Sequence, residues 1–567
     1  MLNLIDKIGD WNPQLFRELK GRLKPFPFVI ALVTSLATQL IIFIYQLLKF
    51  PSYEKDVSNI HFKYCKSGYI KEAYSDFVSC PPNQIDIQLW WRDHFEYMFL
   101  SLSVIFIFTL LVAGTYLIIN DLAQEERKGT LNFIRLSPQS EANLFTGKLL
   151  GVPALIYLAV IAAIPFHVLT GKLANIAFSY ILLFYLIVVA SCIFFYSIAS
   201  LFGIYGGSAF SGFKPWLGSG LVLLFLWMTM AMSRQAYHNY IAFFRLFSPA
   251  DITGYLFPNL FNKQTPTLQD LQFFNLALGK NLFSTVAIHL LNYAVWTYWV
   301  WQGLKRCFRN PNATIFSKQQ SYLIVASFEI MILGFLISED YSRREIFYEG
   351  IGAFYVWNLS LLLPFFALLL PHRQAIQDWA RFRYHKNANS TDASKKFLFS
   401  ELMLGEKSPA IVAIAINLLI AASTFIVLSL NASTDSSYAS KHILLILSIS
   451  LLFISLTVIY ATTAQIMLML KNSKRTLWAM GTTSAVIILP LMIFGIFNVQ
   501  PHNILWQFTI VFWVAVKDYA ESTVPNMCIA FLCQLIIIGL LNWYLIKQVK
   551  FAGESATKAL FSQSNVI

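Results

Sequence analysis

Long runs of apolar residues, separated by shorter polar segments, dominate the chain. About twelve of these runs can cross a hydrocarbon core about 30 Å thick, which a helix spans with about 20 residues. They cover residues 28–49, 97–119, 149–169, 178–203, 216–232, 282–303, 321–338, 351–371, 410–430, 442–463, 479–498 and 524–546. The pattern predicts an all-α polytopic membrane protein, because a spanning helix satisfies its own backbone hydrogen bonds.

One further apolar piece, residues 505–516, is too short to cross comfortably. We expect it to form a re-entrant or interfacial segment. The alternative is a thirteenth span, which would place the C-terminus on the outer side of the membrane.

The composition agrees with a membrane protein. Of the 567 residues, 57% are hydrophobic and 13% charged, whereas soluble proteins are about 45–50% apolar and about 25% charged. The net charge of +13 could indicate a nucleic-acid partner, but the basic residues are scattered among the polar segments between apolar runs. That distribution is typical of a membrane protein, so we expect contact with the lipid bilayer and none with nucleic acid.

The distribution of Lys and Arg predicts the orientation. With the N-terminus in the cytosol, cytosolic segments hold roughly twice as many Lys and Arg as outer ones. An even number of spans then leaves both termini cytosolic, in a membrane that is expected to be the bacterial inner membrane. Two outer segments are long, residues 51–96 and 233–280. Cys65 and Cys80 share the first, and in an oxidising compartment they could form a disulfide.

The polar segment 120–148 lies between the second and third apolar runs. Its first residues are acidic and its later ones basic, which favours a short helix through the helix dipole. Gly129 should break this helix, Thr130 should cap the next turn, and Pro138 should end that turn, because the residue before proline avoids the α region. We therefore expect a compact amphipathic element at the membrane surface.

The order of residues in this segment resembles the region between the second and third spans of type-2 ABC exporter permeases. The matching residues are the run Glu125-Glu126-Arg127-Lys128-Gly129-Thr130-Leu131, then Ser137-Pro138, then Gly147-Lys148. In that family this element, residues 121–138 here, is the coupling helix, which docks into a cleft of a separate ATPase subunit. The resemblance implies that this chain is the transmembrane subunit of a bacterial exporter and that ATP and Mg bind to the partner. It assigns the docking to Glu125, Glu126, Arg127, Gly129, Thr130 and Leu131, with Pro138 and Gly147 setting the angle of the third span.

A second match to the same family lies within residues 1–27. Here apolar residues Leu15, Phe16, Leu19 and Leu23 line one helix face. The other face carries the basic residues Arg17, Lys20, Arg22 and Lys24. Such a helix should lie flat on the cytosolic leaflet and attract anionic lipid. The family carries a connecting helix at this position, directly before its first span.

Six spans make one unit in this family, so the chain has the length of two units. The first bundle would cover 28–303, a cytosolic linker 304–320, the second bundle 321–546, and a cytosolic tail 547–567. Internal repeats are common in transporters, because two equivalent bundles can rock about a central path. Segment 372–409 takes the place of the coupling helix in the second bundle but lacks its Gly-Thr-Leu core. The repeat is therefore degenerate, and two interpretations stay open: a pseudo-dimer within one chain, or an enlarged subunit that pairs with a second permease.

Glu329 is the ionisable residue that stands clearly in the middle of an apolar run. A charge there costs about 2.5–3.5 kcal/mol on insertion scales, so such a residue is a candidate functional site. A neutral Glu329 in an interhelical hydrogen bond would explain it equally well. The sequence shows no phosphate-binding loop, no nucleophile elbow and no metal-ligand spacing, so we expect no catalytic, metal or cofactor site in this chain.

Two other functions fit the same sequence. An ion-driven secondary transporter would use Glu329, and its transport would collapse with the proton gradient. A membrane scaffold would show no transport at all. Co-purification of an ATPase would favour the exporter.

Overall fold

The computed structural model describes residues 9–50, 64, 70–71, 78–79, 85–205, 212–232, 239–250, 252, 271–311, 313–337, 344–387, 393–432, 437–472, 474–500 and 503–553. Over these residues the fold is helical apart from one isolated bridge and one short antiparallel hairpin, which pairs β1 (Ile70–Lys71) with β2 (Val78–Ser79). The prediction of an all-α protein is confirmed.

The chain divides into two compact units. Unit 1 contains Met1–Tyr237, Phe244–Leu271 and Leu278–Phe308, and unit 2 contains the remaining residues. The main division, after Phe308, falls within the predicted linker 304–320. The first part of that linker is helical, because the last helix of unit 1 continues to Arg309.

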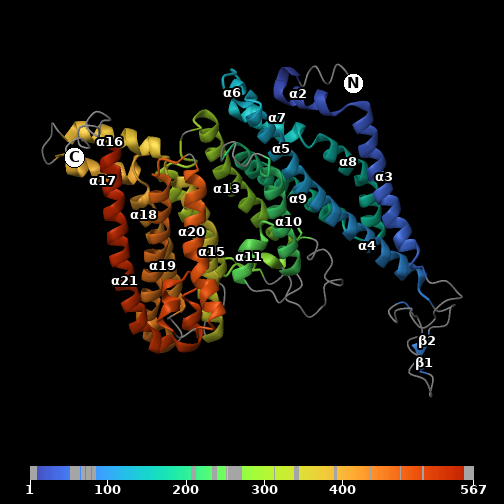
Figure 1. The fold of residues 1–567 in the computed structure, drawn as a ribbon. Coiled ribbons are helices and arrows are strands. Elements are labelled where there is room, and N and C mark those ends of the chain that lie inside the picture. The colour runs from blue at the N-terminus through green and yellow to red at the C-terminus, as the bar shows by residue number, and fades with distance from the viewer. Residues whose placement is uncertain are drawn as a thin grey trace. The chain divides into compact units, whose positions relative to one another are not determined.

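The main helices of unit 1 follow the predicted runs closely. In chain order the elements are α2 (Pro13–Arg22), α3 (Pro25–Leu47), α4 (Ile87–Phe108), the π-helical η4 (Thr109–Ala113), α5 (Gly114–Arg127), α6 (Thr130–Arg135), α7 (Glu141–Gly151), α8 (Ala154–Leu173), α9 (Phe178–Ile204), α10 (Lys214–Met232), η7 (Leu278–Lys280) and α13 (Leu282–Arg309). The short helix α11 (Asn239–Arg245) is divided between the two units after Phe243. Figure 1 shows α2, α6 and α7 at one end of this unit and the β1–β2 hairpin at the opposite end.

Unit 2 is built around α19. Its elements are α14 (Lys318–Leu336), α15 (Arg344–Leu369), α16 (Arg373–Asn387), α17 (Ala393–Leu404), α18 (Ile411–Ala432), α19 (Ser437–Leu468), α20 (Arg475–Ile496), the 3-10 helix η8 (Ile504–Phe508) and α21 (Val514–Gly553). Helix α19 packs against α18, α20 and α21, and α14 packs on α18. The short helices α16 and α17 lie at one end of this bundle (Figure 1).

Among the described residues, eleven helices are long and apolar enough to cross a membrane. They match eleven of the predicted runs. The twelfth run, 282–303, also forms a helix, the 28-residue α13. It is less apolar than the others because polar and aromatic side chains such as His289, Asn292 and Trp296 interrupt it. The chain is therefore a multi-span membrane protein.

Segment 505–516 does not form a helix of its own across the membrane. It consists of η8 and a turn that leads into α21. The Trp506 indole donates a hydrogen bond to the Val499 carbonyl at 3.0 Å, and the Gln534 amide of α21 donates to the Gln507 carbonyl at 3.0 Å. The first bond ties the segment to the residues after α20 and the second ties it to α21, in line with the prediction that it is too short to span.

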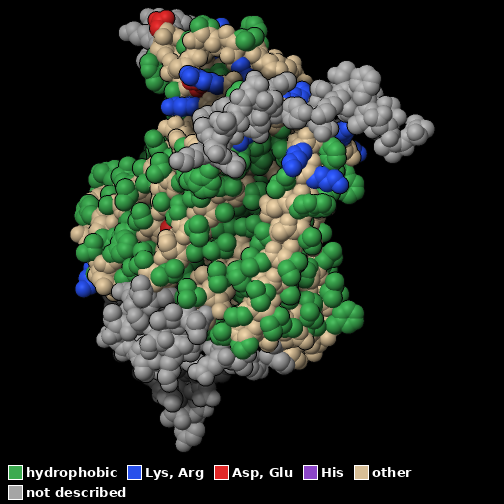
Figure 2. Space-filling model, turned by 90° about the vertical axis from the view of Figure 1, so that its left-hand side faces the viewer, with side chains coloured by type: hydrophobic (Ala, Val, Ile, Leu, Met, Phe, Trp, Pro, Cys, Tyr) green, Lys and Arg blue, Asp and Glu red, His purple; other side chains and the backbone are tan. Residues whose placement is uncertain are grey.

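Apolar side chains cover the outside of the helices. In α21, for example, Ile536, Leu540 and Trp543 are each more than half exposed. On the face shown in Figure 2, apolar side chains form a broad band, and Lys and Arg side chains gather above it. A soluble protein rarely exposes so wide an apolar surface, so this band is the surface that contacts lipid.

A long continuous helix joins the core of unit 1 to its polar end. Helices α4, η4 and α5 form one 41-residue helix, Ile87–Arg127. Leu110 lies in the π-helical turn of this long helix, and its carbonyl accepts a hydrogen bond of 2.7 Å from the hydroxyl of Tyr196 on α9. Gly114 leaves room for that hydroxyl, since a Cβ at this position would collide with it.

Candidate functional site

Helix α5 ends at the tight turn that the sequence predicts. Gly129 has φ 72°, in the left-handed region that favours glycine. The Thr130 hydroxyl donates to the Glu125 carbonyl at 3.2 Å, so it satisfies a free carbonyl at the end of α5 rather than capping α6. Helix α6 ends at Arg135, two residues before Ser137-Pro138.

Helix α6 has one buried and one exposed apolar side. Leu131 and Ile134 are 2% and 8% exposed, whereas Phe133 and Leu136 are 79% and 86% exposed. The residues of the turn, from Arg127 to Thr130, are also exposed, as is Pro138. The turn and α6 therefore present two large apolar side chains at the polar end of unit 1.

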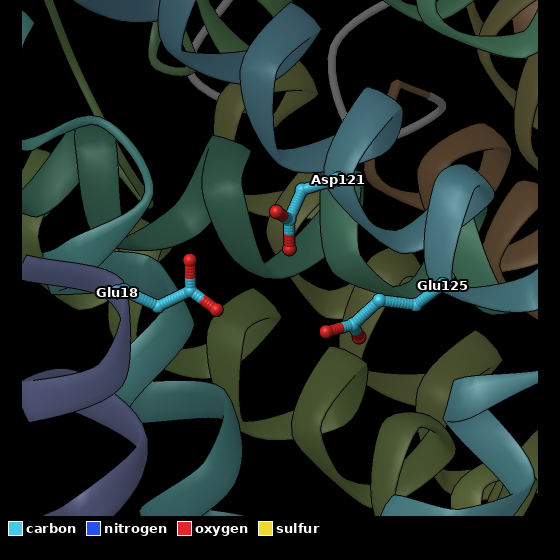
Figure 3. A group of neighbouring side chains, drawn as sticks. All are labelled: Glu18, Asp121 and Glu125. Atoms are coloured by element: carbon cyan, nitrogen blue, oxygen red, sulfur yellow. The ribbon is translucent and has the colours of Figure 1, made fainter. Parts of the chain in front are cut away.

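Three acidic side chains converge beside this turn. Glu18 comes from α2, and Asp121 and Glu125 come from α5, with their carboxyl groups directed toward a common space (Figure 3). One oxygen from each lies within 4.8 Å of the others, an arrangement that could hold a metal ion. Three carboxylates this close repel one another unless a cation lies between them.

Lys148 of α7 supplies that cation. Its Nζ lies 2.6 Å from Asp121 Oδ2, 2.8 Å from Glu125 Oε2 and 3.6 Å from Glu18 Oε1, and its side chain is fully buried. The ammonium group thus occupies the position between the three carboxylates in which a metal ion would bind, and it offsets part of their charge. Burial favours a lower pKa for Lys148, but Asp121, Glu125 and Glu18 outweigh it and hold the pKa above its ordinary value.

Two arginines of α2 complete the ion network. Arg17 lies 2.6 Å from Glu125 and Arg22 lies 2.6 Å from Asp121, and both also contact Glu18, at 3.2 and 3.3 Å. Three carboxylates therefore meet three cations, with no net formal charge. Buried charges are tolerated when each is paired, so the network can join α2, α5 and α7 without leaving an isolated charge.

Helix α2 approaches α7 closely because two glycines of α7 face it. A Cβ at Gly147 would lie 2.8 Å from both the Asn12 side chain and the Leu15 backbone nitrogen, and one at Gly151 would lie 2.5 Å from Glu18 Cβ. Residues four apart share a helix face. Asn12 strengthens the contact, since its Oδ1 accepts from the Leu15 amide at 3.0 Å and its Nδ2 donates to the Asn143 carbonyl at 2.7 Å.

Glu126 turns to the other side of α5. It lies 3.1 Å from Nζ of Lys214, a buried residue at the start of α10. The neighbours Glu125 and Glu126 therefore connect α5 to different helices, the first to α2 and α7 and the second to α10. Both have ion-pair partners within unit 1, which the sequence-based assignment to docking did not include.

The basic face of α2 is divided between two surroundings. Lys20 and Lys24 are exposed, as expected for a helix on the membrane surface. Arg17 and Arg22 instead pair with acids of α5, and Leu15 is buried against α7. Part of the basic face is therefore used in ion pairs with α5, whose acids lie about a hundred positions away in the sequence.

The sequence analysis quoted Lys148 in the resemblance without giving it a role, and it did not identify Gly151, Asn12 or Lys214 as parts of the site. Two signals were available. Gly147 and Gly151 have the small-residue spacing of closely packed helices, and Lys148 stands between them, next to the apolar pair Leu149-Leu150. A lysine in such surroundings needs an acidic partner.

The remaining predicted site residues lie elsewhere. Glu329 is 2% exposed, within α14 of unit 2, beside the side chains of Asn358 and Thr424. Cys65 and Cys80 fall outside the described residues.

Comparisons with known proteins assign no family to this chain. No protein-family model matches it, and neither a curated protein nor a solved structure matches it significantly.

Proposed function

We propose that this multi-span membrane protein is the transmembrane subunit of an ABC-type exporter, and that the α5–α6 turn docks onto a separate ATPase subunit. The observation that carries the proposal is the exposure of Phe133 and Leu136 on a short helix at the polar end of unit 1. Large apolar side chains that project from a polar surface mark protein contacts. Central aromatic anchors contribute much of the binding energy at such contacts.

The ion network supports the second half of the proposal, the transmission of motion. Glu125 and Glu126 fix α5 to α2, α7 and α10, so a push on α6 reaches several helices together. Helix α5 also continues through η4 into α4, a candidate span. ATP-driven closure of the partner would thus tilt the helices of unit 1, with ATP and Mg bound on the partner.

In this proposal the docking contact differs from the one that the family resemblance implies. The two glutamates hold α5 in place, and the exposed residues of the turn and α6 form the contact surface. The polar end that carries α2 and α6 then faces the cytosol. Segment 372–409 of unit 2 would offer a second, unlike contact, where Phe382 and Phe399 are each more than half exposed.

The test uses the chain in proteoliposomes together with an ABC ATPase subunit that co-purifies with it, and the absence of any such ATPase would itself count against the proposal. We expect Phe133→Ser combined with Leu136→Ser to abolish the stimulation of ATP hydrolysis by the chain. The matched control is Phe213→Ser, which alters a 62% exposed phenylalanine of unit 1 outside α6. If the double variant stimulates ATP hydrolysis as strongly as the wild type, the proposal is refuted.

The orientation is tested separately. A cysteine at position 136, in a chain without its native cysteines, should react with a membrane-impermeant maleimide in inverted vesicles and not in right-side-out ones. The reverse pattern would place α6 on the outer side and exclude docking to a cytosolic ATPase.

A further inference from the structure

Glu329 lies in the middle of α14, and no ion pair joins it to any residue that the structure describes. It is 2% exposed, and the side chains beside its carboxyl group are the neutral Asn358 of α15 and Thr424 of α18. Both neighbours are buried, at 0% and 8% exposure. Three helices of unit 2 thus bring one acid and two neutral polar groups together within the apolar part of the bundle.

The polar side chains next to Glu329 also hydrogen-bond to backbone carbonyls of their own helices. The Asn358 amide donates to the Phe354 carbonyl at 3.2 Å, and the Thr424 hydroxyl donates to the Ile420 carbonyl at 3.4 Å. Among the described residues, no donor reaches Oε1 or Oε2 of Glu329, or Oδ1 of Asn358, with hydrogen-bond geometry. Within the described part of the chain, three buried acceptor oxygens therefore meet here without a hydrogen bond of good geometry.

A proton supplies the missing donor. An ionised carboxylate without donors is very costly in an apolar interior, whereas the neutral acid carries its own O–H group. Donation from that group to Asn358 Oδ1 pairs two of the three acceptors in one bond. We propose that Glu329 and Asn358 form an intramembrane proton-binding site, with Glu329 as the group that takes up and releases the proton.

Further polar groups lie near the first turn of α14. Ser321 lies on the same side of α14, and its hydroxyl accepts a hydrogen bond from the Asn417 amide of α18 at 2.9 Å. At the start of the helix, Lys318 donates to Ser408 Oγ at 2.7 Å and to the carbonyls of Leu402 and Pro409, at 2.7 and 3.0 Å. In this proposal the proton enters from this end of α14.

Two other titratable groups on or near the packed helices have polar partners of their own. Tyr322 of α14 donates to the Met403 carbonyl, and Glu401 of α17 pairs with Arg383 at 3.3 Å. Tyr355 of α15 packs its ring against Phe425, Phe453 and Phe512. Its hydroxyl is buried without a hydrogen bond of good geometry to a described residue.

The test is infrared difference spectroscopy of the full chain in lipid nanodiscs. We expect a carbonyl band of a protonated carboxylic acid that is absent from Glu329→Gln, and a downward shift of that band when H₂O is replaced by D₂O. Asn358→Leu should shift the band upward, because it removes the acceptor of the hydrogen bond. Asn417→Leu should slow the exchange into D₂O.

Two results would overturn the proposal. If wild type and Glu329→Gln show the same carbonyl bands, Glu329 does not carry a proton. If the band exists but does not shift in D₂O, the acid is a fixed structural group. Should Glu329→Gln fail to fold, the isotope shift in wild type and the band position in Asn358→Leu still decide the matter. The measurement needs no ATPase, so its outcome is independent of the proposed function.

Discussion

Replacing Lys148 by methionine tests the ion network most directly. Methionine keeps much of the length of the side chain but removes its charge. Glu18, Asp121 and Glu125 would then share only Arg17 and Arg22, and the space between the three carboxyl groups would contain no cation.

The expected cost follows from burial. Removing one partner of a buried ion pair costs about 3–5 kcal/mol, because the remaining charge is buried without compensation. Lys148 is fully buried, but the side chains of Asp121 and Glu125 are 17% and 14% exposed and that of Arg17 is 51% exposed. Partial solvation and the two arginines reduce the penalty, so we expect a loss near the lower limit, about 3 kcal/mol.

The loss should be local, because the network joins α2 to the rest of unit 1. Hydrogen–deuterium exchange of the full chain in detergent should show faster exchange of the amides of α2, with little change in α8 and α9. Asp121→Asn is the matched second change for a double-mutant cycle. Since it removes one of the uncompensated acids, the double variant should be more stable than the sum of the single effects predicts.

Unchanged exchange in α2, together with additive single effects, would refute this reasoning. It would mean that the contact of α2 with Gly147 and Gly151 fixes the helix without help from the charges.

Three further predictions concern the same region. Gly147→Ala should destabilise the α2–α7 contact by about 1–3 kcal/mol, as expected for overpacking, and calorimetry in detergent should show a lowered melting temperature. The control Gly220→Ala, at a position where a Cβ meets no other atom, should leave the melting temperature unchanged. The pKa of Lys148 is raised in the folded protein, so its contribution to stability is complete below the ordinary lysine pKa of about 10.4 and is lost as the pH rises through the folded value. The difference in stability between wild type and Lys148→Met should therefore stay constant from neutral pH to about pH 10 and shrink above it. Glu126→Lys or Lys214→Glu alone should lower the free energy of unfolding by about 1.5–3 kcal/mol. The combined charge swap should restore both the thermal stability and the stimulation of the ATPase. If the swap variant is stable but no longer stimulates the ATPase, Glu126 contacts the partner itself.

The sequence predicted the main helices well because apolar runs are long and each spanning helix satisfies its own hydrogen bonds. The weakest assignment was 282–303, where aromatic and polar side chains lower the hydropathy of a helix that is long enough to cross. The turn at Gly129 was also predictable, since it depends on local chemistry alone.

The partners of the charged residues were not predictable in the same way. Arg17 and Glu125 are 108 positions apart, and Glu126 and Lys214 are 88 apart. Spacing within one helix predicts which residues share a face, but it does not reveal which distant helix that face meets. The sequence therefore indicated an element at the membrane surface and missed the contacts that hold it.

The π-helical turn η4 sets the rotation of α5 about the helix axis relative to α4. A π-helical turn contains one residue more than an α-helical turn, and each residue of an α-helix advances the side-chain direction by about 100°. Deleting a single residue from Thr109–Ala113 would therefore rotate α5 by about 100° relative to α4. Asp121 and Glu125 would then point away from Lys148, and the direction of α6 would change with them. The direction in which α6 projects is therefore set by one extra residue in the middle of the long helix that precedes it.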